Sequence, residues 1–208
     1  KAGGRLDLIL LTHHHFDHID GVAALVERYG AKVIGAAADA HRLPPLDIAV
    51  APGDRVAVGC EEATVIDVSG HTIGHVAYHF PHAGKAFTAD SLMALGCGRL
   101  FEGTAAQMWA SLSRLMEMPP ETQIFSGHDY FDANARFALS IEPESDALKT
   151  RIARKAAGAP VMPATLAEEL ATNPFLRAPI PSVKAAVNLP GADNAAVFAE
   201  IRRRKDGF

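Results

Sequence analysis

LDLILLTHHHFDH, residues 6–18, is the stretch that decides the fold of this 208-residue chain. Its first six residues are almost all apolar, which predicts a β-strand covered on both faces. The strand runs directly into THHHFDH, residues 12–18, so polar side chains gather at its carboxyl end. IDGVAALVERYG, residues 19–30, has helical apolar spacing and a final glycine, and AKVIGA, residues 31–36, predicts another strand. The order strand, loop, helix, strand favours α/β architecture.

The THHHFDH segment offers four metal ligands within one short loop. His13 and His15 alternate on an extended segment and point the same way, so their imidazoles can reach one ion. Asp17 and His18 follow in the predicted turn, where they can reach a second ion. The segment therefore predicts a site for two neighbouring metal ions.

Three further ligand-type residues follow predicted strands: His71 in SGHTIGH, Asp90 in FTAD and His128 in SGHDY. Each of these residues alone would more often be a solvated side chain. Together with the four of the THHHFDH segment they make seven ligand-type residues at strand ends, which is improbable for residues that are merely exposed. We assign Asp90 as the carboxylate that bridges two ions. Because metal binding lowers the pKa of water towards about 7, the set implies hydrolysis of a carbonyl or phosphoryl group.

The donor set contains nitrogen and oxygen without thiolate, which suits zinc, iron or manganese. The residues do not choose among the three metals, and zinc is our first choice. Four other histidines are expected to be surface groups or to support the ligands; they are His14, His75, His79 and His82.

The rest of the chain divides near residue 130. Short strands are expected at 54–58, 63–68, 75–80, 85–89 and 122–127, with an amphipathic helix after the predicted N-cap Thr104. Strand signals fade after about Phe131, where Ala-rich stretches separated by prolines predict helices. We therefore expect a metal-binding catalytic domain at residues 1–130 and a small helical, substrate-binding domain at 131–208.

Composition excludes several classes of protein. The net charge of −4 gives no basic field for nucleic acid or an anionic membrane, and no apolar run is long enough to span a bilayer. Cys60 and Cys97 are too few for a disulfide framework, so free thiols and a cytoplasmic location are expected by default. We also expect a monomer. The chain begins with Lys1, and we expect that a preceding segment is missing.

THHHFDH resembles the THxHxDH signature of the metallo-β-lactamase superfamily, and GHTIGH, FTAD and GHDY fit its later ligand segments in order. Within it, residues 89–112, ADSLMALGCGRLFEGTAAQMWASL, and the ending RRRKDGF resemble the glyoxalase II family. The resemblance implies an αββα sandwich with a helical C-terminal domain. The family's opening strands have no counterpart before Leu6.

The resemblance also implies site residues. One ion would be held by His13, His15 and His71, the other by Asp17, His18 and His128, and both by Asp90. The implied contacts to glutathione are Arg99, Tyr130, Arg202 and Lys205, which fits because Arg and Lys can pair with the two carboxylates of glutathione.

The activity implied by the resemblance is hydrolysis of S-2-hydroxyacylglutathione. The thioester of S-D-lactoylglutathione would be cleaved to glutathione and D-lactate, in methylglyoxal detoxification, by a metal-bound hydroxide held with the help of Asp90 and Asp17.

Three alternatives stand beside this hypothesis. A persulfide dioxygenase-like enzyme shares the first motif and the GCGR loop but uses a single iron; FEGT and the helical ending argue against it. A metal-dependent phosphodiesterase is disfavoured by the negative charge and the single basic cluster. A purely structural metal module is disfavoured because structural zinc sites are usually closed by four ligands, whereas this set leaves room for water.

Overall fold

The computed structural model describes residues 4–208, so Lys1 and the first residues of the predicted catalytic domain lie outside the described part. The chain opens with a parallel three-stranded sheet in the order β1-β2-β3, with bounds Leu8–Leu10, Lys32–Ala36 and Ile48–Val50. The helices α1 (Phe16–Ile19) and α2 (Val22–Tyr29) lie between β1 and β2, and a 3-10 turn, Ala37–Asp39, follows β2.

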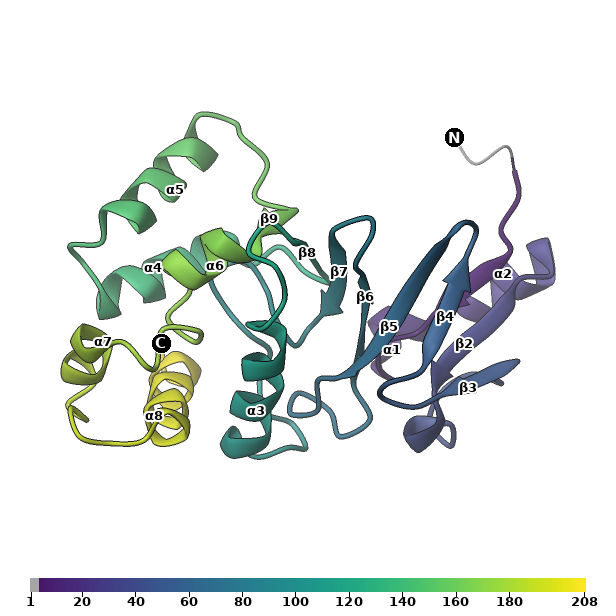
Figure 1. The fold of residues 1–208 in the computed structure, drawn as a ribbon, viewed down its shortest axis with the longest axis horizontal. Coiled ribbons are helices and arrows are strands. Elements are labelled where there is room, and N and C mark those ends of the chain that lie inside the picture. The colour runs from purple at the N-terminus through teal and green to yellow at the C-terminus, as the bar shows by residue number, and fades with distance from the viewer. Residues whose placement is uncertain (1–3) are drawn as a thin grey trace.

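A second sheet of six strands forms the centre of the molecule, in the order β4-β5-β6-β7-β8-β9 (Figure 1). Its pairings are antiparallel except for the parallel pair β7·β8. The bounds of its strands are Arg55–Val58, Glu61–Asp67, Val76–Phe80, Lys85–Ala89, Gln123–Ser126 and Ala164–Thr165.

The helices α3 to α8 lie on the far side of this sheet, and α4 to α8 build the C-terminal part (Figure 1). Their bounds are Ala105–Leu115, Phe131–Ile141, Asp146–Ala156, Leu166–Thr172, Pro181–Ala186 and Asn194–Asp206. Thr104 caps α3 as predicted and forms a capping box with Gln107, which satisfies two backbone N–H groups at the start of the helix. Among residues 4–208, no helix is long and apolar enough to cross a membrane.

Three buried clusters define four layers. Val22 of α2 packs against Val33 on the outer face of the first sheet, and Ile34 packs with Val65 and Tyr78 between the two sheets. Leu112 of α3 lies in the largest cluster, on the far face of the second sheet. The order helix, sheet, sheet, helix is the αββα sandwich that the resemblance implies.

The largest cluster crosses the predicted domain boundary near residue 130. Leu112 and Ile124 from one side of that boundary pack in the same cluster as Phe137, Leu166 and Phe198 from the other. The α3 helix also packs directly on α8. The helical C-terminal part therefore shares its core with the sandwich.

The structure corrects two expectations and adds to a third. Among residues 4–208, the first strand is half-buried rather than covered on both faces, because β1 is the end strand of the sheet that these residues form and lies beside an open, mostly apolar cavity of about 540 Å³. Asp17 and His18 belong to the short helix α1, not to a turn. The expectation that strand signals fade after Phe131 needs one addition: β9 pairs with β8, although its two residues are too few to give a sequence pattern.

Candidate metal centre and its pocket

The predicted ligands lie at the ends of strands from both sheets. His13 and His15 follow β1, and His71 lies in the loop between β5 and β6. Asp90 directly follows β7, and His128 follows β8, its parallel neighbour. Carboxyl ends of parallel strands meet at one edge of a sheet, which explains why residues 38 positions apart come together here.

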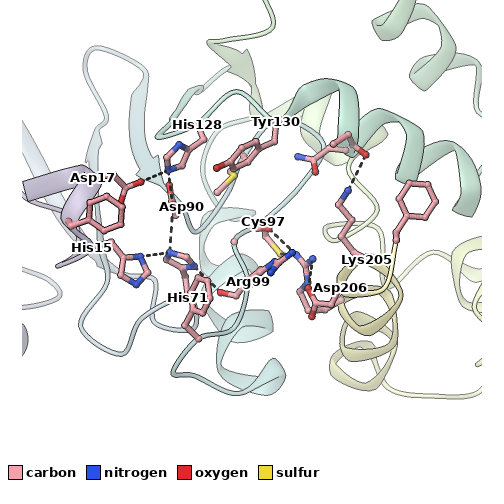
Figure 2. Close-up of a pocket in the computed structure, with 18 residues that line it drawn as sticks. His15, Asp17, His71, Asp90, Cys97, Arg99, His128, Tyr130, Lys205 and Asp206 are labelled. Carbon is pink, nitrogen blue, oxygen red and sulfur yellow. Dashed lines mark hydrogen bonds and ion pairs between the residues drawn. The ribbon is translucent and has the colours of Figure 1, made fainter.

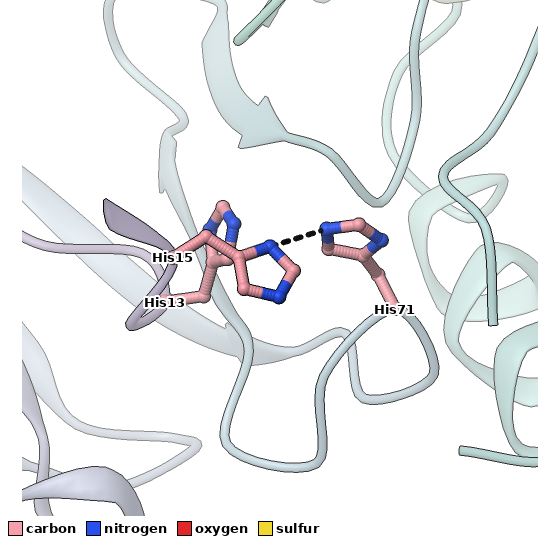
Figure 3. Close-up of side chains that lie close together, drawn as sticks. All are labelled: His13, His15 and His71. Atoms are coloured by element: carbon pink, nitrogen blue, oxygen red, sulfur yellow. Dashed lines mark hydrogen bonds between the residues drawn. The ribbon is translucent and has the colours of Figure 1, made fainter. Parts of the chain in front are cut away.

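Two groups of side chains match the two predicted ligand sets. In the first, His13, His15 and His71 converge, with His15 Nδ1 3.0 Å from His71 Nε2 (Figure 3). The second group brings together Asp17, His18 and His128, in which His128 Nε2 lies 3.2 Å from Asp17 Oδ2 and 3.3 Å from His18 Nε2. Within each group the donor atoms lie within 4.8 Å of one another, so one ion could contact all three.

Asp90 lies between His71 of the first group and His128 of the second (Figure 2). Its Oδ2 is 3.5 Å from His71 Nε2 and 3.3 Å from His128 Nε2, and its Oδ1 is 3.5 Å from His18 Nε2. The preceding residue, Ala89, has a φ of 43°, a conformation that non-glycine residues rarely adopt. Strain of this kind persists only where surrounding contacts impose it, and here it turns Asp90 out of the β7 strand.

The environment keeps several of these imidazoles neutral. Burial lowers the pKa of His13, His15 and His71, and neighbouring histidines add to the effect. His18 differs, because its interaction with Asp90 raises its pKa. Burial raises the pKa of Asp90, but the nearby histidines, His18 first among them, outweigh burial and lower it. Neutral imidazoles and an ionised carboxylate are the forms that bind metal ions.

These residues fit a divalent metal ion. His13 is fully buried, and its Nε2 has no hydrogen-bond partner in the part of the chain that the structure describes. An unpaired buried nitrogen costs free energy unless something binds it. His13 also stacks on the buried His75, whose pKa is lowered to about 3 by burial, so a second neutral ring packs behind the ligand. The donor set and the unpaired nitrogen thus support a divalent metal site.

Supporting contacts fix the orientation of these rings. His71 Nδ1 donates to the carbonyl of Arg99 at 2.8 Å, which leaves Nε2 facing the centre. His14, which stands between two of the predicted ligands, contacts the buried carboxylate of Asp39 at 3.0 Å. Arg42 in turn pairs with Asp39 and Glu102, and Glu102 accepts from the backbone N–H of Ile73 at 2.8 Å. This network ties the loop of His71 to the histidine segment.

A cavity of about 640 Å³ opens over the metal centre (Figure 2). His15, Asp17, His71, Asp90 and His128 line one end of it. The other end is formed by the loop around Arg99 and by the C-terminal helices. Side chains from both ends of the sequence therefore meet in one pocket.

Models of two protein families match the chain. Residues 1–128 match the metallo-beta-lactamase superfamily, and residues 129–208 match the hydroxyacylglutathione hydrolase C-terminus. A protein from Fuscovulum blasticum named hydroxyacylglutathione hydrolase is 64% identical over 210 residues, which cover 99% of this chain and 82% of that protein. The chain belongs to the hydroxyacylglutathione hydrolase family. The predicted glyoxalase II resemblance is thereby confirmed.

Solved structures agree with the metallo-β-lactamase fold. The crystal structure of ETHE1 from Myxococcus xanthus superposes with a TM-score of 0.63 and 27% identity, covering 96% of this chain and 69% of that one. TTHA1623, solved in a di-iron-bound form, gives a TM-score of 0.58 and 30% identity, covering 81% and 77%. The predicted fold class is therefore confirmed for this member of the hydroxyacylglutathione hydrolase family.

The four predicted substrate contacts all line the pocket of this family member. Arg99 is exposed there, and the ring of Tyr130 stacks on His128 with centroids 5.1 Å apart. Lys205 is half-buried, and its Nζ donates to the carbonyl of Ala133 at 3.0 Å. Burial lowers the pKa of Lys205, and repulsion from nearby arginines lowers it further, so an anion bound here would be attracted by several cations.

Arg202 is placed differently from the other three. Only 5% of this residue is exposed, and its Nη1 donates to the carbonyl of Cys97 at 3.0 Å while Nη2 pairs with Asp206 at 2.7 Å. Two of its donor groups are therefore engaged within the protein. Its Nε has no partner among residues 4–208.

Sequence reasoning missed several residues of the pocket. Phe16 and Phe101 are largely exposed and stand beside the metal centre, and Asn134 and Phe208 line the opposite end. Phe16 lies inside THHHFDH itself and Phe101 follows the GCGR loop, so nearness to motif residues could have pointed to both. No comparable signal marks Asn134.

Proposed function

We propose that this protein is a hydroxyacylglutathione hydrolase that cleaves the thioester of S-D-lactoylglutathione to glutathione and D-lactate, in methylglyoxal detoxification. The observation that carries this proposal is the 640 Å³ pocket, in which the metal-ligand groups and the cations Arg99 and Lys205 face one cavity. A substrate with a reactive thioester and distant carboxylates needs both features. The family membership supports the same activity.

The centre would hold two divalent ions, with zinc as our first choice and iron or manganese as alternatives. Asp90 lies where one carboxylate could contact both ions, and the di-iron-bound form of TTHA1623 supports a count of two. When bound, such ions polarise a carbonyl oxygen and make water acidic enough to supply hydroxide near neutral pH.

The side chains of the chain would bind and orient the thioester. Lys205 and Arg99 would pair with the glutathione carboxylates, and Tyr130 would offer its hydroxyl to the peptide backbone of glutathione. Phe16 and Phe101 would border the acyl group. Asp17, whose Oδ2 lies 3.2 Å from His128 Nε2, lines the pocket where it could accept a proton from the attacking water.

Release of free thiol from S-D-lactoylglutathione tests the proposal. Metal-loaded protein should release thiol rapidly, and protein stripped of metal should not. No release from protein shown to contain metal would contradict the proposed activity. Consumption of oxygen with glutathione persulfide by protein holding one iron would favour the persulfide dioxygenase, which the family match does not favour.

The substrate contact is tested with Lys205→Met and the matched control Lys184→Met. Both lysines donate Nζ to a backbone carbonyl, Lys205 to Ala133 and Lys184 to Ala192, but only Lys205 lines the pocket. Losing a hydrogen bond to a charged group costs about 1.5 to 3 kcal/mol, so KM should rise at least about tenfold in Lys205→Met alone. Equal KM values in both variants would contradict a contact between Lys205 and the substrate.

We further propose that the protein is a monomer of the cytoplasm. Cys60 and Cys97 are free thiols and form no disulfide with each other, which supports a reducing compartment. Size-exclusion chromatography with light scattering tests the monomer, and a mass of twice the chain would contradict it.

A further inference from the structure

The segment 89–99 carries two parts of the metal centre at its two ends. Asp90 stands at its start, and the Arg99 carbonyl that accepts from His71 Nδ1 stands at its end. The two ends are joined directly, since the N–H of Gly98 donates to the carbonyl of Asp90 at 2.8 Å. Any displacement of this segment would move one ligand and release the orientation of another.

Between these ends the segment makes a tight turn at residues 93–96. Met93 and Gly96 exchange both backbone hydrogen bonds, each at 3.0 Å. Leu95, inside the turn, has a φ of 59°, which a leucine adopts only when its surroundings impose it. The turn therefore needs support from other parts of the chain.

Part of that support is the hydrogen bond from Asn134 Nδ2 to the carbonyl of Ala94 at 3.0 Å, and the rest comes from α6 and the residue that ends it. Glu169 Oε2 accepts from the N–H of Leu95 at 3.0 Å. Asn173 Nδ2 donates to the carbonyl of Met93 at 3.2 Å and to the carbonyl of Gly96 at 3.0 Å. The side chains of Glu169 and Asn173 thus bind three backbone groups of a turn that lies more than 70 positions earlier in the chain.

Both side chains are fully buried and are themselves held in place. Asn173 Nδ2 contacts Glu169 Oε2 at 3.0 Å, and Arg151 forms a buried ion pair with the other oxygen of Glu169. Arg151 also donates to Thr172 Oγ1 at 2.8 Å. A buried network with its donors and acceptors paired holds one geometry, because each altered contact would leave an unpaired polar group.

We propose that Glu169 and Asn173 are positioning residues of the metal centre: they fix the turn 93–96 and, through it, Asp90 and the Arg99 carbonyl that orients His71. Neither residue lines the pocket, so neither contacts substrate. The C-terminal part would therefore contribute to metal binding as well as to substrate binding. The proposal rests on the metal-dependent function proposed above.

Zinc binding by metal-free protein tests this, measured by competition with a chromophoric chelator in the absence of substrate. Asn173→Ala removes both hydrogen bonds that Nδ2 makes to the turn, without adding charge. Loss of a group that orients metal ligands typically costs 10- to 100-fold in metal affinity, so zinc affinity should fall about tenfold or more. The visible spectrum of the cobalt-substituted protein should also change, since it reports the ligand geometry.

Glu142→Gln is the matched control. Glu142 also pairs with an arginine of the helical part, Arg177, at 2.6 Å, but it does not contact the turn 93–96. Both variants should melt at a lower temperature in the metal-free state, whereas only Asn173→Ala should lose zinc affinity and alter the cobalt spectrum. Wild-type zinc affinity in Asn173→Ala, or an equal loss in Glu142→Gln, would overturn the proposal.

A second pair of variants covers the case in which Asn173→Ala does not fold. Glu169→Gln keeps an oxygen that can accept from Leu95, and Glu169→Ala does not, so Gln should retain more zinc affinity than Ala. Equal affinities would overturn the proposal. If the wild-type chain binds no zinc, the proposed metal centre is wrong and this proposal fails with it. If the wild-type chain binds zinc but does not hydrolyse the thioester, only the proposed activity is wrong.

Discussion

Two glycines leave room for the predicted metal ligands where a side chain would collide with them. A Cβ on Gly98 would lie 2.3 Å from the carbonyl oxygen of Asp90 and 2.7 Å from His71 Nδ1. A Cβ on Gly127 would lie 2.5 Å from Asp90 Oδ1 and 2.7 Å from His18 Cε1. These positions require glycine because of close approach, not because of their backbone angles.

Gly98→Ala should therefore lose metal affinity, by about tenfold or more, because the methyl group would push Asp90 and His71 apart. Metal content after dialysis against a chelator checks this. Gly21→Ala is the control, since a Cβ there would meet no atom within 4 Å. Full metal retention in Gly98→Ala would contradict the packing argument.

The two thiols should differ in reactivity. Burial raises the pKa of Cys97 to about 11, although Arg202 acts in the opposite direction, whereas Cys60 is exposed. Only the thiolate is alkylated, so iodoacetamide at pH 8 should modify Cys60 and leave Cys97 intact, with Cys97 reacting only as the pH approaches 11. Peptide mapping by mass spectrometry measures both, and equal modification at pH 8 would contradict the burial of Cys97.

At the scale of single residues, the sequence predicted which side chains come together at the candidate metal centre, but it did not predict the contacts that hold them in place. The segments with His71, Asp90 and His128 could be found because each follows a strand and carries a ligand-type residue. Glu169 and Asn173 could not, since their partners are backbone groups of a distant turn and such contacts leave no local pattern.

The α3 helix shows how local sequence sets an element. Thr104 accepts from the N–H of Gln107 at 3.2 Å, and Gln107 accepts from the N–H of Thr104 at 2.8 Å. Thr104→Ala should destabilise the protein by about 1 kcal/mol, because the hydroxyl that caps the helix is lost. Urea unfolding, with the free energy extrapolated to water, measures the change. Thr104 does not line the pocket of the metal centre, so metal content should stay that of the wild type.

Elements with several periodic residues were predictable, and short ones were not. The strands β5 and β6 and the helix α3 each contain enough alternating or helical positions to show a pattern. The strands β3 and β9, of three and two residues, do not. The error about burial of β1 has another origin, because an apolar run does not reveal that its strand ends the sheet formed by residues 4–208.

For the whole molecule, the cluster that crosses residue 130 predicts a single unfolding transition in metal-free protein. Trp109, the only tryptophan of the chain, packs against Phe198 of α8, so its fluorescence reports the contact between the two parts. The urea midpoint measured by Trp109 fluorescence should coincide with the midpoint measured by far-ultraviolet circular dichroism. Two separated midpoints would show that the parts unfold independently.

The fold class and the family could be predicted from motifs that lie along the whole chain. The division at residue 130 stays a prediction, because the change in composition marks where strands give way to helices and does not reveal that both sides share one core.

The segment 89–99 would also link two binding equilibria at the proposed site. An ion at Asp90 and a carboxylate at Arg99 would bind to opposite ends of one short stretch whose ends are hydrogen-bonded together. Thermodynamic reciprocity then requires that, if the ion strengthens binding of the glutathione moiety by some factor, that moiety strengthens retention of the ion by the same factor. If that factor exceeds one, glutathione bound at Arg99 would slow the loss of the ion to a chelator.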